Sequence, residues 1–148
     1  RRIGSKKKSS VALNHPVGEE VRVSSPFGER THPVTGAKKD QHNGTDYAAP
    51  RNTPVKAMFD GEVTFADDQG GNTGFIVKIK DKLGREVKYM HLEPGSLKVE
   101  KGQKIKAGHH VAGVGKTGRG TGYHLHAELH VDGKPVDIEK YLKEQNDA

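Results

Sequence analysis

The chain has 148 residues, of which 31% are hydrophobic and 30% charged, and its formal net charge is +6. This length suits one domain, and so polar a composition favours a loop-rich β domain over a helical bundle with wide apolar stripes. The chain contains no cysteine, which excludes disulfides and thiolate ligands, so any bound metal must be held by His, Asp or Glu. No apolar run has the length of a membrane span, and none has the form of a signal-peptide core.

The N-terminal segment is strongly basic. Its first eight positions include Arg1, Arg2, Lys6, Lys7 and Lys8. Because a segment rich in Lys, Ser and Arg buries too little apolar surface to fold, we predict a flexible basic arm or linker over residues 1–14 and one domain over residues 15–148. The arm is either a solvated tail or a contact for anionic polymers of a cell wall. It has neither interleaved aromatic residues nor a known nucleic-acid motif, so no specific nucleic-acid partner is expected.

Glycine and proline recur about every ten residues after the arm, which is typical of short strands joined by turns. Alternating apolar and polar residues, together with turn signals, predict three hairpins. They comprise residues 74–80 with 85–92, residues 56–66 turning at Asp60-Gly61, and residues 124–131 followed by a turn at Asp132-Gly133. Only residues 138–144 have a helical pattern, with Asp137 as the cap. The sequence therefore predicts a mainly β fold with a short C-terminal helix.

Four of the nine histidines stand in contexts that favour metal or proton chemistry. His42 and Asp46 are four positions apart with Asn-Gly between them, which favours a turn or irregular strand over a helix. Gly44 would let the backbone fold tightly enough to bring the imidazole and the carboxylate together. Alone, a His-x-x-x-Asp pair gives weak support to a metal site.

His124 and His126 lie in a predicted strand, where alternation directs both side chains to one face and Leu125 to the core. Two neighbouring imidazoles can bind one metal together, or one can bind while the other transfers protons. A polar face directed to solvent is the alternative, because Glu128 and His130 continue the same face.

His91 ends a predicted strand, a position where a single histidine is usually structural or exposed. Considered together, these histidines and Asp46 support a metal site more strongly than any of them does alone. Catalytic zinc typically keeps three protein ligands and an open position for water. Two histidines and one aspartate could supply the ligands, and the two remaining histidines could deprotonate the water and stabilise the oxyanion.

Three segments of the chain resemble the lysostaphin/LytM-type zinc metalloendopeptidase family, whose hallmarks are His-x-x-x-Asp, Tyr-x-His-Leu and His-x-His in that order. Here they are His42/Asp46, Tyr89-Met-His-Leu92 and His124-Leu-His126. The lead-in Ser25-Pro-Phe-Gly-Glu-Arg-Thr-His-Pro33 and the segment Gly115-Lys-Thr-Gly118 are similar to the family as well. The resemblance covers roughly residues 21–141. Residues 69–74 depart from it, because they lack the usual Gly-Tyr-Gly-Asn.

This resemblance implies a peptidoglycan hydrolase with one zinc ion per chain. It implies His42, Asp46 and His126 as zinc ligands, and His91 and His124 as general base and transition-state stabiliser in either order. The implied fold is a twisted antiparallel sheet with a groove for the peptide, built as a LytM-like duplicated hybrid motif. The implied reaction is endopeptidase cleavage of peptide cross-links. The lead-in favours D-amino-acid stem-peptide bonds over glycylglycine bridges.

Three further residues are candidates for substrate contact. Asn72 could donate to the substrate or form a turn, and Arg30 could bind a peptide carboxylate or form a structural salt bridge. His32 could line the groove or pack its own loop. Glu128 could orient a metal ligand from behind. The other histidines are expected to be structural or exposed: His15, His109, His110 and His130.

The expected protein is a monomeric domain of the cell envelope, in the periplasm or cell wall, or a secreted or phage-associated lysin. The alternative function is a catalytically inactive relative that binds the cell wall or activates other hydrolases. Such a domain would be expected to lack at least one of the five site residues, and none is missing. Residues 56–63 also resemble lipoyl or biotinyl carriers, but those need an exposed lysine in a hairpin such as Met-Lys-Met, which this chain does not contain.

Overall fold

The computed structural model describes residues 13–31, 39–118 and 122–147, and of residues 29–31, 39–42 and 147 it describes the backbone alone. The first strands are β1 (Arg22–Ser25), β2 (Gly28–Thr31), β3 (Lys39–His42), β4 (Thr45–Ala48), β5 (Pro54–Lys56) and β6 (Gly61–Asp68). They are followed by β7 (Phe75–Lys80), β8 (Arg85–Leu92), β9 (Lys104–Ile105), β10 (His110–Gly113), β11 (His124–Val131) and β12 (Lys134–Val136). The helix α1 spans Ile138–Asp147.

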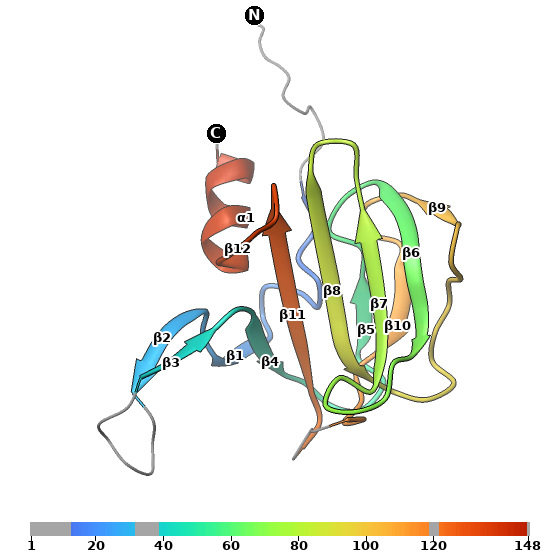
Figure 1. The fold of residues 1–148 in the computed structure, drawn as a ribbon, viewed down its shortest axis with the longest axis horizontal. Coiled ribbons are helices and arrows are strands. Elements are labelled where there is room, and N and C mark those ends of the chain that lie inside the picture. The colour runs from blue at the N-terminus through green and yellow to red at the C-terminus, as the bar shows by residue number, and fades with distance from the viewer. Residues whose placement is uncertain (1–12, 32–38, 119–121, 148) are drawn as a thin grey trace, which may run out of the picture.

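An eight-stranded antiparallel sheet forms the main layer of the described part (Figure 1). Its strand order is β1-β4-β11-β8-β7-β6-β9, and β12 pairs with β11. Two small sheets, β2-β3 and β5-β10, stand apart from this path. Figure 1 shows β5 and β10 behind the main sheet, and valines of both strands share one apolar core with β6, β7 and β8. The predicted mainly β, antiparallel fold with a short C-terminal helix is confirmed.

Two of the predicted hairpins are confirmed. β7 pairs with β8, and the turn between them is held by Asp81, whose Oδ1 accepts hydrogen bonds from the N–H groups of Leu83 and Arg85, both at 2.9 Å. β11 pairs with β12 through the predicted turn. There Asp132 and Gly133 both have positive φ, 53° and 85°, as a two-residue turn that matches the strand twist requires.

The predicted hairpin over residues 56–66 is wrong. β5 pairs with β10, whereas β6 pairs with β7 and β9, so the two halves belong to different sheets. The connecting residues 57–59 are buried and carry the chain from one layer to the other. The hydroxyl of Tyr89 holds them by accepting from the Met58 N–H at 3.1 Å and donating to the Lys56 carbonyl at 3.0 Å. Burial of three successive apolar residues thus outweighs the local preference of Asp-Gly for a hairpin turn.

The helix α1 closes the core at the C-terminal end of the chain. Ile138 and Leu142 are buried, and the predicted cap is present, because Asp137 Oδ1 accepts a hydrogen bond from the Lys140 N–H at 3.3 Å. The helix has 10 residues. No helix in the described ranges combines the length and apolarity that a membrane crossing requires.

The folded unit begins earlier than the predicted boundary at residue 15. Leu13 is 8% exposed and belongs to the core. Its N–H donates to Asn146 Oδ1 at 2.9 Å, and its carbonyl accepts from Asn146 Nδ2 at 3.1 Å. Asn14 is hydrogen-bonded to the carbonyl of Met58. Residues 13 and 14, which the sequence assigned to the arm, therefore belong to the domain.

Candidate functional site

The site is built on the first residues of β11 and the strands on either side of it. Alternation along β11 places Leu125 in the core at 0% exposure and leaves His124 and His126 half-buried on the opposite face, as predicted. In the antiparallel register His126 stands opposite Asp46 of β4 on one side and Met90 of β8 on the other. Because β8 and β11 are antiparallel, the end of β8 and the beginning of β11 lie at the same end of the sheet (Figure 1).

His126 lies between two carboxylates. Its Nδ1 is 2.6 Å from Asp46 Oδ1, and its Nε2 is 2.9 Å from Glu128 Oε2. Burial would lower the pKa of His126, but the hydrogen bonds to Asp46 and Glu128 raise it to about 9. Burial would likewise raise the pKa of Glu128, which the hydrogen bonds from His126 and His130 instead lower to about 2. In the metal-free chain the His126 ring is therefore an imidazolium that donates from both nitrogens.

Gly44 lets the backbone before Asp46 lie close to His126 and Glu128 of β11. A Cβ at residue 44 would lie 2.6 Å from the Ala127 carbonyl oxygen and 2.8 Å from both Glu128 Cγ and His126 Cε1. The segment between His42 and Asp46 therefore lies directly against β11. Gly44 permits this approach because it has no side chain, and its φ is not in the left-handed region. The role predicted for it, bringing His42 and Asp46 together, stays a prediction because the His42 side chain lies outside the described part.

His91 reaches the site through a β-bulge. Val77 of β7 pairs with Tyr89 and Phe75 pairs with Leu92, so two residues of β8, Met90 and His91, face the single Ile76. Regular alternation after the buried Tyr89 would have put His91 in the core. The bulge, with φ of 62° at His91, buries Leu92 instead and leaves His91 half-buried, with its ring centroid 4.9 Å from that of His124 and 6.1 Å from that of His126.

Main-chain carbonyls hold the rings of both His91 and His124 by Nδ1. His91 Nδ1 is 2.8 Å from the Thr117 carbonyl oxygen, and His124 Nδ1 is 2.9 Å from that of Gly122. Because a carbonyl oxygen only accepts, Nδ1 carries the proton in each ring, and Nε2 is the nitrogen that accepts a proton. Burial lowers the pKa of His91, and the neighbouring rings of His124 and His126 lower it further, although the Thr117 carbonyl opposes them. His91 is therefore neutral at neutral pH.

The remaining predicted site residues are placed only in part. His42 ends β3, where its backbone pairs with Gly28, and Arg30 lies in β2; the side chains of both lie outside the described part. His32 lies outside the described residues altogether. Asn72 is exposed in the turn of residues 71–73, whose main chain touches the loop that holds His91. Among the described side chains no three His, Asp or Glu groups are arranged to hold one metal ion, and the described part of the predicted ligand set is Asp46 and His126.

Two of the histidines expected to be structural or exposed contact carboxylates. His130 Nε2 donates to Glu128 Oε1 at 3.0 Å, so His130 supports the carboxylate that faces His126. His15 Nε2 is 2.7 Å from Glu139 Oε2 in a network away from this face. Thr117 lies in the family-like segment of residues 115–118, whose sequence contains no signal of its contact with His91.

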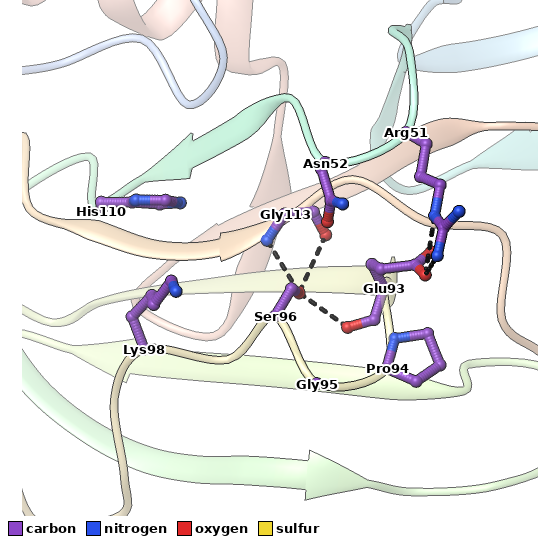
Figure 2. A pocket seen from close by; sticks show the side chains of 9 residues that line it. All are labelled: Arg51, Asn52, Glu93, Pro94, Gly95, Ser96, Lys98, His110 and Gly113. Carbon is purple, nitrogen blue, oxygen red and sulfur yellow. Dashed lines mark hydrogen bonds and ion pairs between the residues drawn. The ribbon is translucent and has the colours of Figure 1, made fainter.

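A separate open pocket of about 350 Å³ contains none of the predicted site residues. Figure 2 shows Ser96 at its centre and the Arg51 guanidinium on the carboxylate of Glu93, with the closest N–O distance 2.9 Å. The Ser96 hydroxyl donates to the Glu93 carbonyl at 2.6 Å and accepts from the Gly113 N–H at 2.9 Å. These bonds join the chain after β8 to the end of β10 and are sufficiently explained as a structural junction.

Comparison with known proteins connects this geometry to a family. Residues 40–138 match the model of Peptidase family M23. The DD-carboxypeptidase/endopeptidase Mpg of Neisseria meningitidis serogroup B is 43% identical over 117 residues, which cover 79% of this chain and 26% of Mpg. The chain thus spans about a quarter of the length of that curated relative.

Solved structures share the fold. A zinc-containing peptidase from Vibrio cholerae superposes with a TM-score of 0.75 and 38% identity, covering 86% of this chain and 39% of that one. The catalytic domain of the antimicrobial peptidase lysostaphin from Staphylococcus simulans superposes with a TM-score of 0.71 and 26% identity, covering 83% and 92%. The lysostaphin-like fold expected from the sequence is confirmed.

Proposed function

Because the chain belongs to peptidase family M23, we propose that it is a zinc-dependent endopeptidase that hydrolyses peptide cross-links of bacterial peptidoglycan. The observation that carries the proposal is the convergence of Asp46, His126, His91 and His124 on one face of the sheet, although 80 residues separate the first two along the chain. A domain that only binds the cell wall has no need of a His126–Asp46 pair beside two further imidazoles. Those imidazoles, of His91 and His124, are both held with the proton on Nδ1.

The proposed zinc ligands are His42, Asp46 and His126, one ion per chain. The donor set fits zinc, which accepts imidazole nitrogen and carboxylate oxygen. The contact between His126 and Glu128 supports the assignment, because a metal-binding histidine typically donates its other ring N–H to a carboxylate. His126 would then bind through Nδ1, the nitrogen that faces Asp46. Bound zinc supplies Lewis acidity, which lowers the pKa of water to about 7 and polarises a carbonyl oxygen.

The proposed catalytic groups are His91 and His124. Burial keeps His91 neutral, so its Nε2 is available to accept a proton from water at neutral pH, and we assign proton abstraction to it. The His124 ring, 4.9 Å from that of His91, is assigned to hydrogen bonding with the oxygen on which negative charge develops, and for this role its Nε2 must carry a proton as well as its Nδ1. With the carbonyl bonds to Nδ1 in place, neither ring needs to reorient during the reaction.

D-amino-acid stem-peptide bonds are the proposed substrate, in preference to glycylglycine bridges. Identity to the DD-carboxypeptidase/endopeptidase Mpg is 43%, whereas it is 26% to lysostaphin, and this difference supports the choice. Asn72, Arg30 and His32 remain the proposed substrate contacts. Of these, Asn72 is exposed on the turn beside the loop that holds His91.

The proposed location is the cell envelope, because that is where the substrate is found. A secreted or phage-associated lysin would meet the same substrate from outside the cell. The basic arm, residues 1–14 in the sequence prediction, would add contact with anionic wall polymers, since five of its first eight residues are Lys or Arg. We propose that the domain acts as a monomer.

Digestion of purified peptidoglycan tests the function. The zinc-loaded chain should release soluble fragments from directly cross-linked sacculi faster than from pentaglycine-bridged sacculi, with new ends at D-amino-acid bonds by mass spectrometry.

Asp46→Ala should lose both zinc and activity, because two ligands make a poor site. His91→Ala should keep one zinc per chain and lose roughly 100-fold in turnover. Tight zinc binding by the wild type without turnover on either substrate would instead favour an inactive wall-binding domain.

A further inference from the structure

We propose that Thr117 is a positioning residue for His91. Its side-chain hydroxyl joins the ends of β7 and β8, and its main-chain carbonyl holds the His91 ring with the proton on Nδ1 and the lone pair on Nε2. The catalytic part of this inference rests on the proposed function, whereas the tautomer of the His91 ring does not.

The hydroxyl of Thr117 lies between two paired strands. Phe75 and Leu92 are partners in the β7–β8 register. The Phe75 N–H donates to Thr117 Oγ1 at 3.1 Å, and Thr117 Oγ1 donates to the Leu92 carbonyl at 2.8 Å. Both bonded residues flank the bulge that contains His91. The hydroxyl is thus inserted at the position where the bulge leaves the regular ladder.

The backbone of Thr117 is held in place by two glycines. A Cβ on Gly74 would lie 2.4 Å from Thr117 Oγ1, and a Cβ on Gly118 would lie 2.6 Å from the Asn72 carbonyl oxygen. Both glycines also have positive φ, 66° and 75°. The loop of residues 115–118 and the turn of residues 69–74 therefore approach each other more closely than side chains at residues 74 and 118 would permit. The Thr117 carbonyl consequently has little freedom to move away from His91 Nδ1, which lies 2.8 Å from it.

His91 needs this support because its backbone is strained. A non-glycine residue with φ of 62° is unusual, and such conformations persist only where the surroundings impose them. The His91 N–H leaves the ladder and donates to the Thr73 carbonyl at 3.0 Å. Without the Thr117 hydroxyl, the Phe75 N–H would lose one acceptor and the Leu92 carbonyl would lose one donor, so the ends of β7 and β8 would close on each other. That closure would displace the bulge and the ring it presents.

Isosteric substitution of Thr117 tests the proposal on the zinc-loaded chain. Thr117→Val removes the hydroxyl at nearly constant volume, Thr117→Ser retains it, and Thr53→Val is the matched control, because Thr53 Oγ1 donates to the Pro50 carbonyl at 2.8 Å in a different loop. Long-range ¹H–¹⁵N spectra report which nitrogen of His91 carries the proton. Turnover of a cross-linked muropeptide gives kcat and KM, and metal analysis gives the zinc content.

We expect wild type, Thr117→Ser and Thr53→Val to show a single Nδ1-protonated His91. Thr117→Val should show mixed tautomers and a roughly 10- to 100-fold lower kcat, with unchanged zinc content and KM. If Thr117→Val does not fold, Thr117→Ala provides the same comparison. A wild-type tautomer in the variant that lacks the hydroxyl overturns the proposal, whatever its kcat, and so does failure of the serine to restore the wild-type state. If the wild type cleaves no peptidoglycan, the proposed function fails while the spectra still decide the role of Thr117.

Discussion

At the scale of single residues, the site consists of charges and protons held by specific partners. His126 gains a carboxylate at each ring nitrogen, at 2.6 and 2.9 Å, while His91 gains only a neutral carbonyl. Their pKa values consequently move in opposite directions, upward for His126 and downward for His91. In the metal-free chain the imidazoles of His126 and His91 therefore differ in protonation state, and the Nδ1 of His126 would have to release its proton before it could bind a metal ion.

The raised pKa of His126 predicts how the stability of the metal-free chain depends on pH. Its contribution is fully present below the unfolded-state pKa of 6.5 and is lost as the pH rises through about 9, because the folded state holds the proton more tightly. A difference of that size corresponds to about 3 kcal/mol. Urea unfolding in the presence of a chelator should show a declining free energy between pH 6.5 and 9.5. In Glu128→Gln the decline should be smaller and occur at lower pH. A flat profile for the wild type would contradict the assignment.

At the scale of elements, the site depends on irregularities in otherwise regular strands. β11 alternates without interruption and presents His124 and His126 to one face. β8 contributes His91 only because a bulge shifts its alternation by one position. Directly before β4, the backbone at Gly44 approaches β11 more closely than a side chain would permit. The regular strand β11 thus provides a scaffold to which a bulged strand and a closely packed glycine bring further groups.

Gly44→Ala tests this close approach. The new Cβ would meet the backbone oxygen of Ala127 at 2.6 Å, and backbone cannot move aside as a flexible side chain can. We expect a loss of about 1–3 kcal/mol in the free energy of unfolding, and a lower zinc affinity because the strand bearing Asp46 must shift. Gly122→Ala is the control for stability, since a Cβ there meets nothing within 4 Å and φ is not positive. Equal stability of the two variants would show that β4 adjusts without cost.

At the scale of the whole domain, the two ends of the described chain are joined beneath the site. Glu139 of α1 accepts from the hydroxyl of Tyr47 at 2.6 Å and lies 2.7 Å from His15 Nε2. Leu13 and Asn146 exchange two further hydrogen bonds. Tyr47 is fully buried and directly follows Asp46 in β4, so the helix supports the strand that carries a proposed zinc ligand.

Glu139→Ala should destabilise the domain by about 1–3 kcal/mol, because it leaves the buried hydroxyl of Tyr47 without its acceptor. The matched control is Glu144→Ala, an exposed glutamate on the same helix, which should change stability by less than about 0.5 kcal/mol. Urea unfolding compares the two, and the pair Tyr47→Phe and Glu139→Ala forms a double-mutant cycle that isolates the bond. A cycle with no coupling energy would mean that the network adds nothing to stability.

Part of this structure was accessible from the sequence because its signals are local. Alternation placed His124, Leu125 and His126 correctly, since a regular strand fixes the face of every side chain. The turn at Asp132-Gly133 and the cap at Asp137 were correct for the same reason. The Asp60-Gly61 signal failed, because burial of residues 57–59 between two layers decides the course of the chain there, and that burial depends on β10, about 50 residues away.

The sequence by itself determined the fold class, the peptidase family and the common face of His124 and His126, because composition, strand alternation and the order of motifs do not depend on which segments meet in space. Only the tertiary structure decided that a bulge turns His91 out of the core, that Glu128 occupies the far nitrogen of His126, and that the Thr117 carbonyl holds the His91 ring. These features either join strands and loops that are distant along the chain or depend on a bulge that changes the strand alternation. No local sequence pattern predicts either effect.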